Sequence, residues 1–220
     1  MNTYARFIVS HRLIVVAVSL AITAVLACFA VGLKIIISPT AMAPQEHPYV
    51  RTTQQIEALF GTKNMVLIGL TPKEGDALQP TVLERVQRIT QALQAEPGLV
   101  RSSLMSLTAP RAKGILAAPD GFEARPLIDH IPTNDKDRER IVRILHDNPL
   151  YLGSVISKDL KTAAIITELK WHSDGFRAMM APIERIVRAE ESTDVSINIA
   201  GIPVYAAATE RFAERINWLF

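Results

Sequence analysis

The sequence predicts an α+β fold in which one N-terminal transmembrane helix is followed by an α/β sandwich domain. Leu13 to Leu33 is a run of 21 residues without a charge, and the chain after it alternates amphipathic segments with short apolar ones. Residues 38–220 are enough for one domain with a real core. The formal net charge of +2 is nearly balanced, so no basic surface indicates a nucleic-acid partner.

The apolar run is long enough to cross a bilayer. At about 1.5 Å of rise per residue it reaches roughly 31 Å, against a hydrocarbon core of about 30 Å. Arg6 and Arg12 precede it and only Lys34 follows closely. The positive-inside rule therefore places residues 1–12 in the cytoplasm, and we assign residues 13–37 to the helix and its exit. Small residues at spacings of four, three and four offer a face for packing against another helix, although alanine is common in any such helix: Ala17, Ala21, Ala24 and Cys28.

A lipoprotein signal is the alternative to an uncleaved helix. Val25-Leu26-Ala27-Cys28 nearly matches a lipoprotein cleavage box, which would make Cys28 a lipid-modified amino terminus. Leu26 fits the small-residue position poorly, and hydrophobicity continues beyond Cys28 to Ile37. These features favour the uncleaved helix. Since Cys28 is the only cysteine, no intrachain disulfide can form.

The first half of the domain, which we place at residues 38–203, is predicted to open with a helix, a strand and a second helix. Residues 48–60 form a helix that Gly61 ends, and the continuous apolar run 64–70 forms a buried strand. A second strand over 100–107 would pair in parallel with the first through a right-handed crossover, unless another strand lies between them. The helix between these strands, residues 81–95, is amphipathic, and its buried face holds Val82, Val86, Ile89 and Leu93.

The second half is predicted to contain a loop-rich stretch, two helices and more strands. Residues 108–133 hold four prolines and two glycines and are therefore expected to be loop-rich. Asn134 is expected to cap a helix over 135–146. Residues 152–157 and 162–169 are expected to form a β-hairpin. Ser173 or Asp174 caps the next helix, and 195–199 form the last strand. Together these elements predict two or more helices layered on a sheet of about five strands. The inward face of the helix after Asp174 holds Phe176, Met179, Met180, Ile183 and Val187.

The last segment, 204–220, is expected to be a helix that leads toward a second transmembrane helix missing from this chain. Its end is apolar, and a tryptophan there suits the entry of a membrane helix. Its polar face is expected to hold Glu210, Arg211, Glu214 and Arg215.

Several local patterns occur behind the apolar run in a fixed order. They are Phe60-Gly61 before the strand Met65 to Leu70, Pro97-Gly98-Leu99-Val100, Ser103 to Leu107, Asn148-Pro149-Leu150-Tyr151, Ser157-Lys158-Asp159 and Gly201-Ile202-Pro203-Val204. The order and spacing of these patterns are hard to obtain by chance. Through them the chain resembles the amino-terminal part of resistance-nodulation-division (RND) transporters, in particular the MMPL-like branch, over essentially its whole length.

The resemblance implies a porter-like domain built of βαβ-type units on the periplasmic side of a bacterial inner membrane. In that family, proton entry through later membrane helices drives the export of lipids or other hydrophobic compounds. The implied partners are the bilayer, the remaining helices of the transporter, a hydrophobic or lipid substrate, and further copies in a homo-oligomer. A segment without the later helices is expected to be transport-incompetent. The alternative is a complete single-span protein, anchored in the membrane or processed at Cys28, with a binding domain outside the cytoplasm.

No enzymatic chemistry is predicted: we expect no catalytic, cofactor-binding or metal site. The five histidines are scattered, no Gly-rich phosphate loop is present, and the serines at 102, 103 and 106 lack a nucleophile elbow. Asp159 is interpreted as a turn residue, and the glycines as backbone permissions at element ends. The family-pattern residues are thus assigned structural roles: Phe60, Gly61, Pro97, Gly98, Ser157, Asp159, Gly201 and Pro203.

Overall fold

The computed structural model describes residues 8–31, 44–60, 64–118 and 121–217. The chain divides into two compact units, Met1–Ile35 and Ile36–Phe220. The first contains the helix α2, Arg12–Val31, whose 18-residue segment Arg12–Phe29 is long and apolar enough to cross a membrane. An anchor and a signal sequence both have this character. The predicted exit at 32–37 lies outside the described residues.

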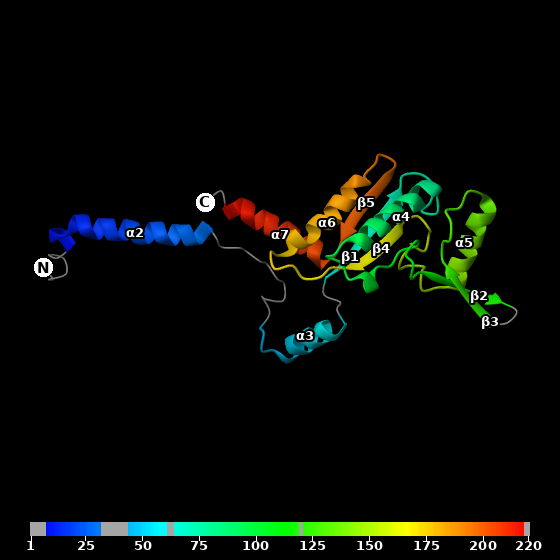
Figure 1. Cartoon of the computed structure of the whole chain (residues 1–220), viewed down its shortest axis with the longest axis horizontal. Helices are drawn as coiled ribbons and strands as arrows, with labels where there is room; N and C mark the ends of the chain where they lie inside the picture. Colours follow the sequence, from blue (N-terminus) through cyan, green and yellow to red (C-terminus); the bar gives the residue numbers. More distant parts are fainter. Residues whose placement is uncertain (1–7, 32–43, 61–63, 119–120, 218–220) are drawn as a thin grey trace. The chain divides into compact units, whose positions relative to one another are not determined.

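The second unit is built on a three-stranded antiparallel sheet (Figure 1). Its strands are β1 (Met65–Pro72), β4 (Ala163–Glu168) and β5 (Val195–Ala200), in the order β4-β1-β5. β1 is antiparallel to both neighbours, so β4 and β5 run in the same direction with β1 between them. The expected parallel pairing of strand 64–70 with residues 100–107 is not found, because β4 lies between β1 and that segment, as the alternative allowed.

Helices cover one face of this sheet. α4 (Pro80–Ala95) and α6 (Phe176–Ala189) lie side by side across it, and α7 (Ile202–Asn217) packs against α6 and β1 (Figure 1). The predicted apolar faces of α4 and α6 are confirmed as buried, and they share one core with Val66, Ile68 and Leu70 of β1. Pro182 lies inside α6, where it removes one backbone donor from the helix.

The helix α3, Pro48–Phe60, confirms the prediction for residues 48–60. None of its described side chains is buried. Gly61, which was expected to end it, lies outside the described residues.

Two segments between α4 and β4 differ from expectation. Residues 100–107 do not form a strand: Arg101–Ser103 is a 3-10 turn, and only isolated bridges join Leu99 to Leu169 and Met105 to Ile166. The stretch 108–133 contains a hairpin that its prolines and glycines did not suggest, with strands β2 (Lys113–Ala118) and β3 (Gly121–Pro126). The five described strands thus form two sheets instead of one.

The helix α5, Asp135–Asp147, begins as predicted. The Asn134 side chain accepts a hydrogen bond from the Asp137 N–H at 3.0 Å, which caps the helix. Its buried residues are Ile141, Ile144 and Leu145. Packing of Ile144 requires a glycine opposite, because a Cβ at Gly114 of β2 would lie 2.7 Å from the Ile144 Cγ2.

The predicted hairpin before α6 is found only in part. Residues 162–169 largely coincide with β4, but 152–157 form no strand and reach β4 through the bridge from Ile156 to Ala163. Neither Ser173 nor Asp174 caps α6. Gly175, at φ 93°, precedes the helix and provides no side-chain cap.

Candidate functional site

Family-pattern residues from distant parts of the chain meet at one end of the sheet. The Lys170 N–H donates to the Gly98 carbonyl at 2.9 Å and the Lys170 Nζ to the Pro97 carbonyl at 3.1 Å. The Leu169 N–H donates to the Asn64 carbonyl at 3.0 Å. We call this region, where β1 begins and β4 and β5 end, the Gly201 end of the sheet.

Gly201 itself is in close contact with the start of β1. Its φ is 136°, and a Cβ there would lie 2.4 Å from the Met65 carbonyl oxygen. Only glycine fits this position without displacement of the backbone. The buried Pro203 follows in the first turn of α7, where the missing N–H has little cost. The contact sets the start of α7 beside the start of β1.

Ser157 and Asp159 lie at the opposite end of the sheet and form a turn. The Ser157 hydroxyl donates to the Asp159 carboxylate and accepts from the Thr162 N–H at 2.9 Å, and the Lys161 N–H donates to Asp159 at 3.1 Å. These bonds, led by that from the Ser157 hydroxyl, lower the pKa of Asp159. Leu160 completes the turn with a φ of 58°, which is uncommon for a bulky residue. The geometry is that of turn chemistry.

The face of the sheet turned away from α4 and α6 has an apolar half near the Gly201 end. Met65 is 45% and Leu67 41% exposed, although both belong to the central strand. Leu67 lies between Ile166 of β4 and Ala200 of β5 in the register. We call this surface the open sheet face; toward its other end it becomes small and polar, with Gly69, Thr71, Thr162, Ser196 and Asn198.

Glu168 adds a charge to the apolar half of the open sheet face. It is the register partner of Met65 and is half-buried. Desolvation by its surroundings raises its pKa. A carboxyl group placed among apolar side chains is favoured in its neutral form.

Two buried side-chain atoms at the Gly201 end have no hydrogen-bond partner among the residues that the structure describes. These are the Asn64 Oδ1 and the Thr167 Oγ1. Asn64 precedes β1, and Thr167 is the register partner of Val66. By the alternation of side chains along the strands, both residues lie on the face of the sheet that the helices cover. Packed side chains fill the space on that face.

A buried carboxylate joins α6 to α7. Glu210 is 5% exposed, and it accepts the N–H groups of Phe176 at 3.2 Å and Arg177 at 2.9 Å. It therefore supplies the cap that Gly175 cannot. A Cβ at Gly175 would lie 2.9 Å from the Glu210 Oε1, so the glycine makes room for the carboxylate.

The assignment of Glu210 to the polar face of the last helix was wrong. Its neighbours in that prediction, Arg211 and Glu214, are exposed and pair with Glu184 and Arg177. A signal for Glu210 was present in the sequence: it follows the buried Ala206 and Ala207 at spacings of four and three, and so falls on the buried stripe of α7.

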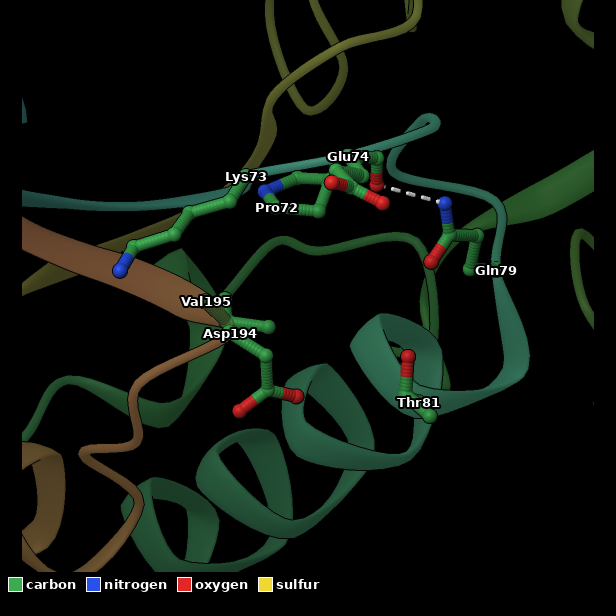
Figure 2. A pocket seen from close by; sticks show the side chains of 7 residues that line it. All are labelled: Pro72, Lys73, Glu74, Gln79, Thr81, Asp194 and Val195. Atoms are coloured by element: carbon green, nitrogen blue, oxygen red, sulfur yellow. Dashed lines mark hydrogen bonds between the residues drawn. The ribbon is translucent and has the colours of Figure 1, made fainter.

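A pocket of about 300 Å³ lies at the end of the sheet opposite to Gly201 (Figure 2). The Gln79 amide bonds the Glu74 carbonyl at 2.8 Å, and the Lys73 N–H bonds the Asp194 carbonyl at 2.9 Å. The Ser192 hydroxyl, foremost among several groups, lowers the pKa of Asp194. The lining is polar and of mixed charge, which is unsuited to an apolar ligand. It consists of Pro72, Lys73, Glu74, Gln79, Thr81, Asp194 and Val195.

Among the described residues, no group of three or more His, Cys, Asp or Glu side chains could hold a metal ion. Neither a family model nor a curated protein sequence matches this chain. The candidate functional features therefore come from the structure itself. They are an apolar helix of membrane-spanning length, an apolar patch on the open sheet face, and the end of the sheet where distant segments of the chain meet.

Proposed function

We propose that this chain contains the first membrane helix and the porter-like domain of an RND-type, MMPL-like exporter of lipids or other hydrophobic compounds. In this proposal α2 spans the inner membrane with its amino terminus in the cytoplasm, and the second unit lies on the periplasmic side. The order of local sequence patterns supports the family, and the apolar character of α2 supports the membrane.

The observation that carries the proposal is the adjacency of the segments that enter and leave the sheet. β1 begins, and α7 begins, at the same corner, where Gly201 contacts Met65. A domain with adjacent points of entrance and exit can be inserted between two consecutive helices of a larger protein. This is the arrangement that a porter-like domain between the first two membrane helices needs.

The membrane-spanning helix α2 lacks the charged side chains that a proton pathway through the membrane would need. Between Leu13 and Val31 the span contains no ionisable side chain apart from Cys28. Proton relays in membranes are built from acidic and histidine side chains facing the bundle interior. Energy coupling is therefore assigned to other membrane helices, and the second unit is assigned to handling of the substrate.

Gene disruption in the native cell tests the proposed export. We expect a lipid or other hydrophobic compound to be retained at the inner membrane, as measured by mass spectrometry of separated membranes, and the intact gene to restore its distribution. A Leu67→Glu variant should fail to restore it, whereas Asn198→Glu, on the polar half of the same face, should succeed. An unchanged distribution after disruption would contradict the proposal.

The topology can be tested separately. In a Cys28→Ser background, Thr193→Cys, in the exposed turn before β5, should react with a membrane-impermeant maleimide in cells whose outer membrane is permeabilised. Protection until the inner membrane is lysed would place the domain in the cytoplasm. Mass spectrometry of the mature amino terminus decides between the anchor and the alternative lipoprotein, in which Cys28 would carry acyl chains.

A further inference from the structure

Two apolar surfaces that the described residues leave largely exposed lie on either side of one short connection in the chain. One is the apolar half of the open sheet face, around Met65 and Leu67. The other is the apolar face of α3, the helix directly before β1. On α3, Ile56 is 48% exposed, and Tyr49 and Leu59 are each 79% exposed. Exposed apolar residues gathered on one side of a helix indicate a surface that is covered in some state of the molecule.

The exposed apolar residues of α3 share one side of the helix. Tyr49 and Ile56 are seven residues apart, which is two turns, and Leu59 follows three residues later. Arg51 and Gln54 fall on the opposite side. The helix is therefore amphipathic and has one face for packing.

The connection to β1 restricts where that face can pack. Phe60 ends α3 and Met65 begins β1, so four residues join them. Connections of two to six residues are typical of a helix that packs on the sheet containing the following strand. The other face of the sheet is filled by α4 and α6, which leaves the open sheet face.

The two surfaces match along their lengths. Thirteen residues make α3 about 20 Å long, and eight residues make β1 about 26 Å long. When α3 folds back over β1, Ile56 and Leu59 come over the apolar half near Met65. Thr52 and Thr53 come over the polar half, where Gly69 leaves room for a helix to approach.

We propose that α3 docks on the open sheet face of its own chain and is the lid of the apolar patch. The docked helix covers Leu67 and its neighbours Ile166 and Ala200, and release of the helix exposes them to an apolar partner. The lid does not depend on an export function. A second copy of the chain or a lipid surface could instead cover the apolar face of α3 and the open sheet face, and the experiment below distinguishes these alternatives from the lid.

Disulfide trapping in the full-length chain tests the lid. In a Cys28→Ser background, which leaves no native thiol, Ile56→Cys is combined with Leu67→Cys. Isolated membranes are oxidised mildly, and the product is examined by non-reducing electrophoresis and peptide mass spectrometry. We expect most of the protein to form an intramolecular disulfide. The matched pair Gln54→Cys with Leu67→Cys should yield at least fivefold less of the intramolecular disulfide, because Gln54 faces away from the sheet when α3 is docked.

Each other outcome overturns the proposal. A disulfide only between two chains would assign the faces to a second copy, and equal yields from the two pairs would mean that α3 has no preferred face. A second measurement uses single thiols: Ile56→Cys should be alkylated at least fivefold more slowly than Gln54→Cys. Adding Leu67→Glu should remove this difference. Slow alkylation of Ile56→Cys that persists with Leu67→Glu and is lost in detergent would assign α3 to the lipid surface.

Discussion

The central strand β1 carries large apolar side chains on both faces of the sheet, but the two faces have different surroundings. In β1, Val66, Ile68 and Leu70 are almost fully buried beneath α4 and α6, whereas Met65 and Leu67 remain more than two-fifths exposed. A strand that needs only one buried face can carry polar residues on the other. The apolar residues on the open face are therefore not required by the helix-covered core.

The largest expected effect separates the two faces directly. Ile68→Ala should lower the free energy of unfolding by about 2–5 kcal/mol, because it leaves a cavity under the helices. Leu67→Ala is the matched control on the open face and should cost clearly less, about 1–2 kcal/mol, since only a lid that docks reversibly covers this side chain. Denaturant unfolding of both variants measures the difference. Equal losses would show that the open face is also part of the core.

A smaller effect is expected from the connection between α6 and α7. Glu210→Ala should cost about 1–3 kcal/mol, because it leaves the N–H groups of Phe176 and Arg177 without an acceptor. Glu214→Ala removes an exposed ion pair with Arg177 and should cost at most about 1 kcal/mol. Thermal unfolding of the two variants checks this order. A reversed order would mean that Glu210 is not the cap of α6.

The smallest effect concerns the charge on the open face. Because desolvation raises the pKa of Glu168 above its ordinary value of 4.5, the folded state binds this proton more tightly than the unfolded state. The resulting stability is present below pH 4.5 and is lost as the pH rises through the folded-state pKa. Glu168→Gln should therefore be more stable than the parent at pH 7, by at most about 1 kcal/mol, with the difference vanishing at pH 4. A variant less stable at pH 7 would indicate that the carboxylate has an attractive partner.

The sequence was sufficient for the helices, because their apolar spacing and caps are local properties. α4, α5 and the buried face of α6 were all predictable from residues within one or two turns of each other. The topology was not predictable in the same way. The run from Met65 to Leu70 is apolar throughout, so its alternation between two faces could not be read from composition, and neither could its central place between β4 and β5.

The sites at element ends depended on long-range contacts. Gly201 was assigned to a turn, yet its contact with the Met65 carbonyl, well over a hundred residues earlier, shows why glycine alone fits. Ser173 and Asp174, the residues before α6, are of the usual cap types, yet the side chain that caps the helix is Glu210. Such partners come together only through packing, and local sequence rules do not contain them.

The cap supplied by Glu210 has a consequence for the order of folding. Its carboxylate is 34 residues away from the Phe176 N–H in the chain, so the first turn of α6 cannot be completed until β5 and α7 are in place. Contacts of this separation carry a loop-closure cost and form late. Kinetic measurements should therefore show that removal of this carboxylate accelerates unfolding while leaving the refolding rate nearly unchanged.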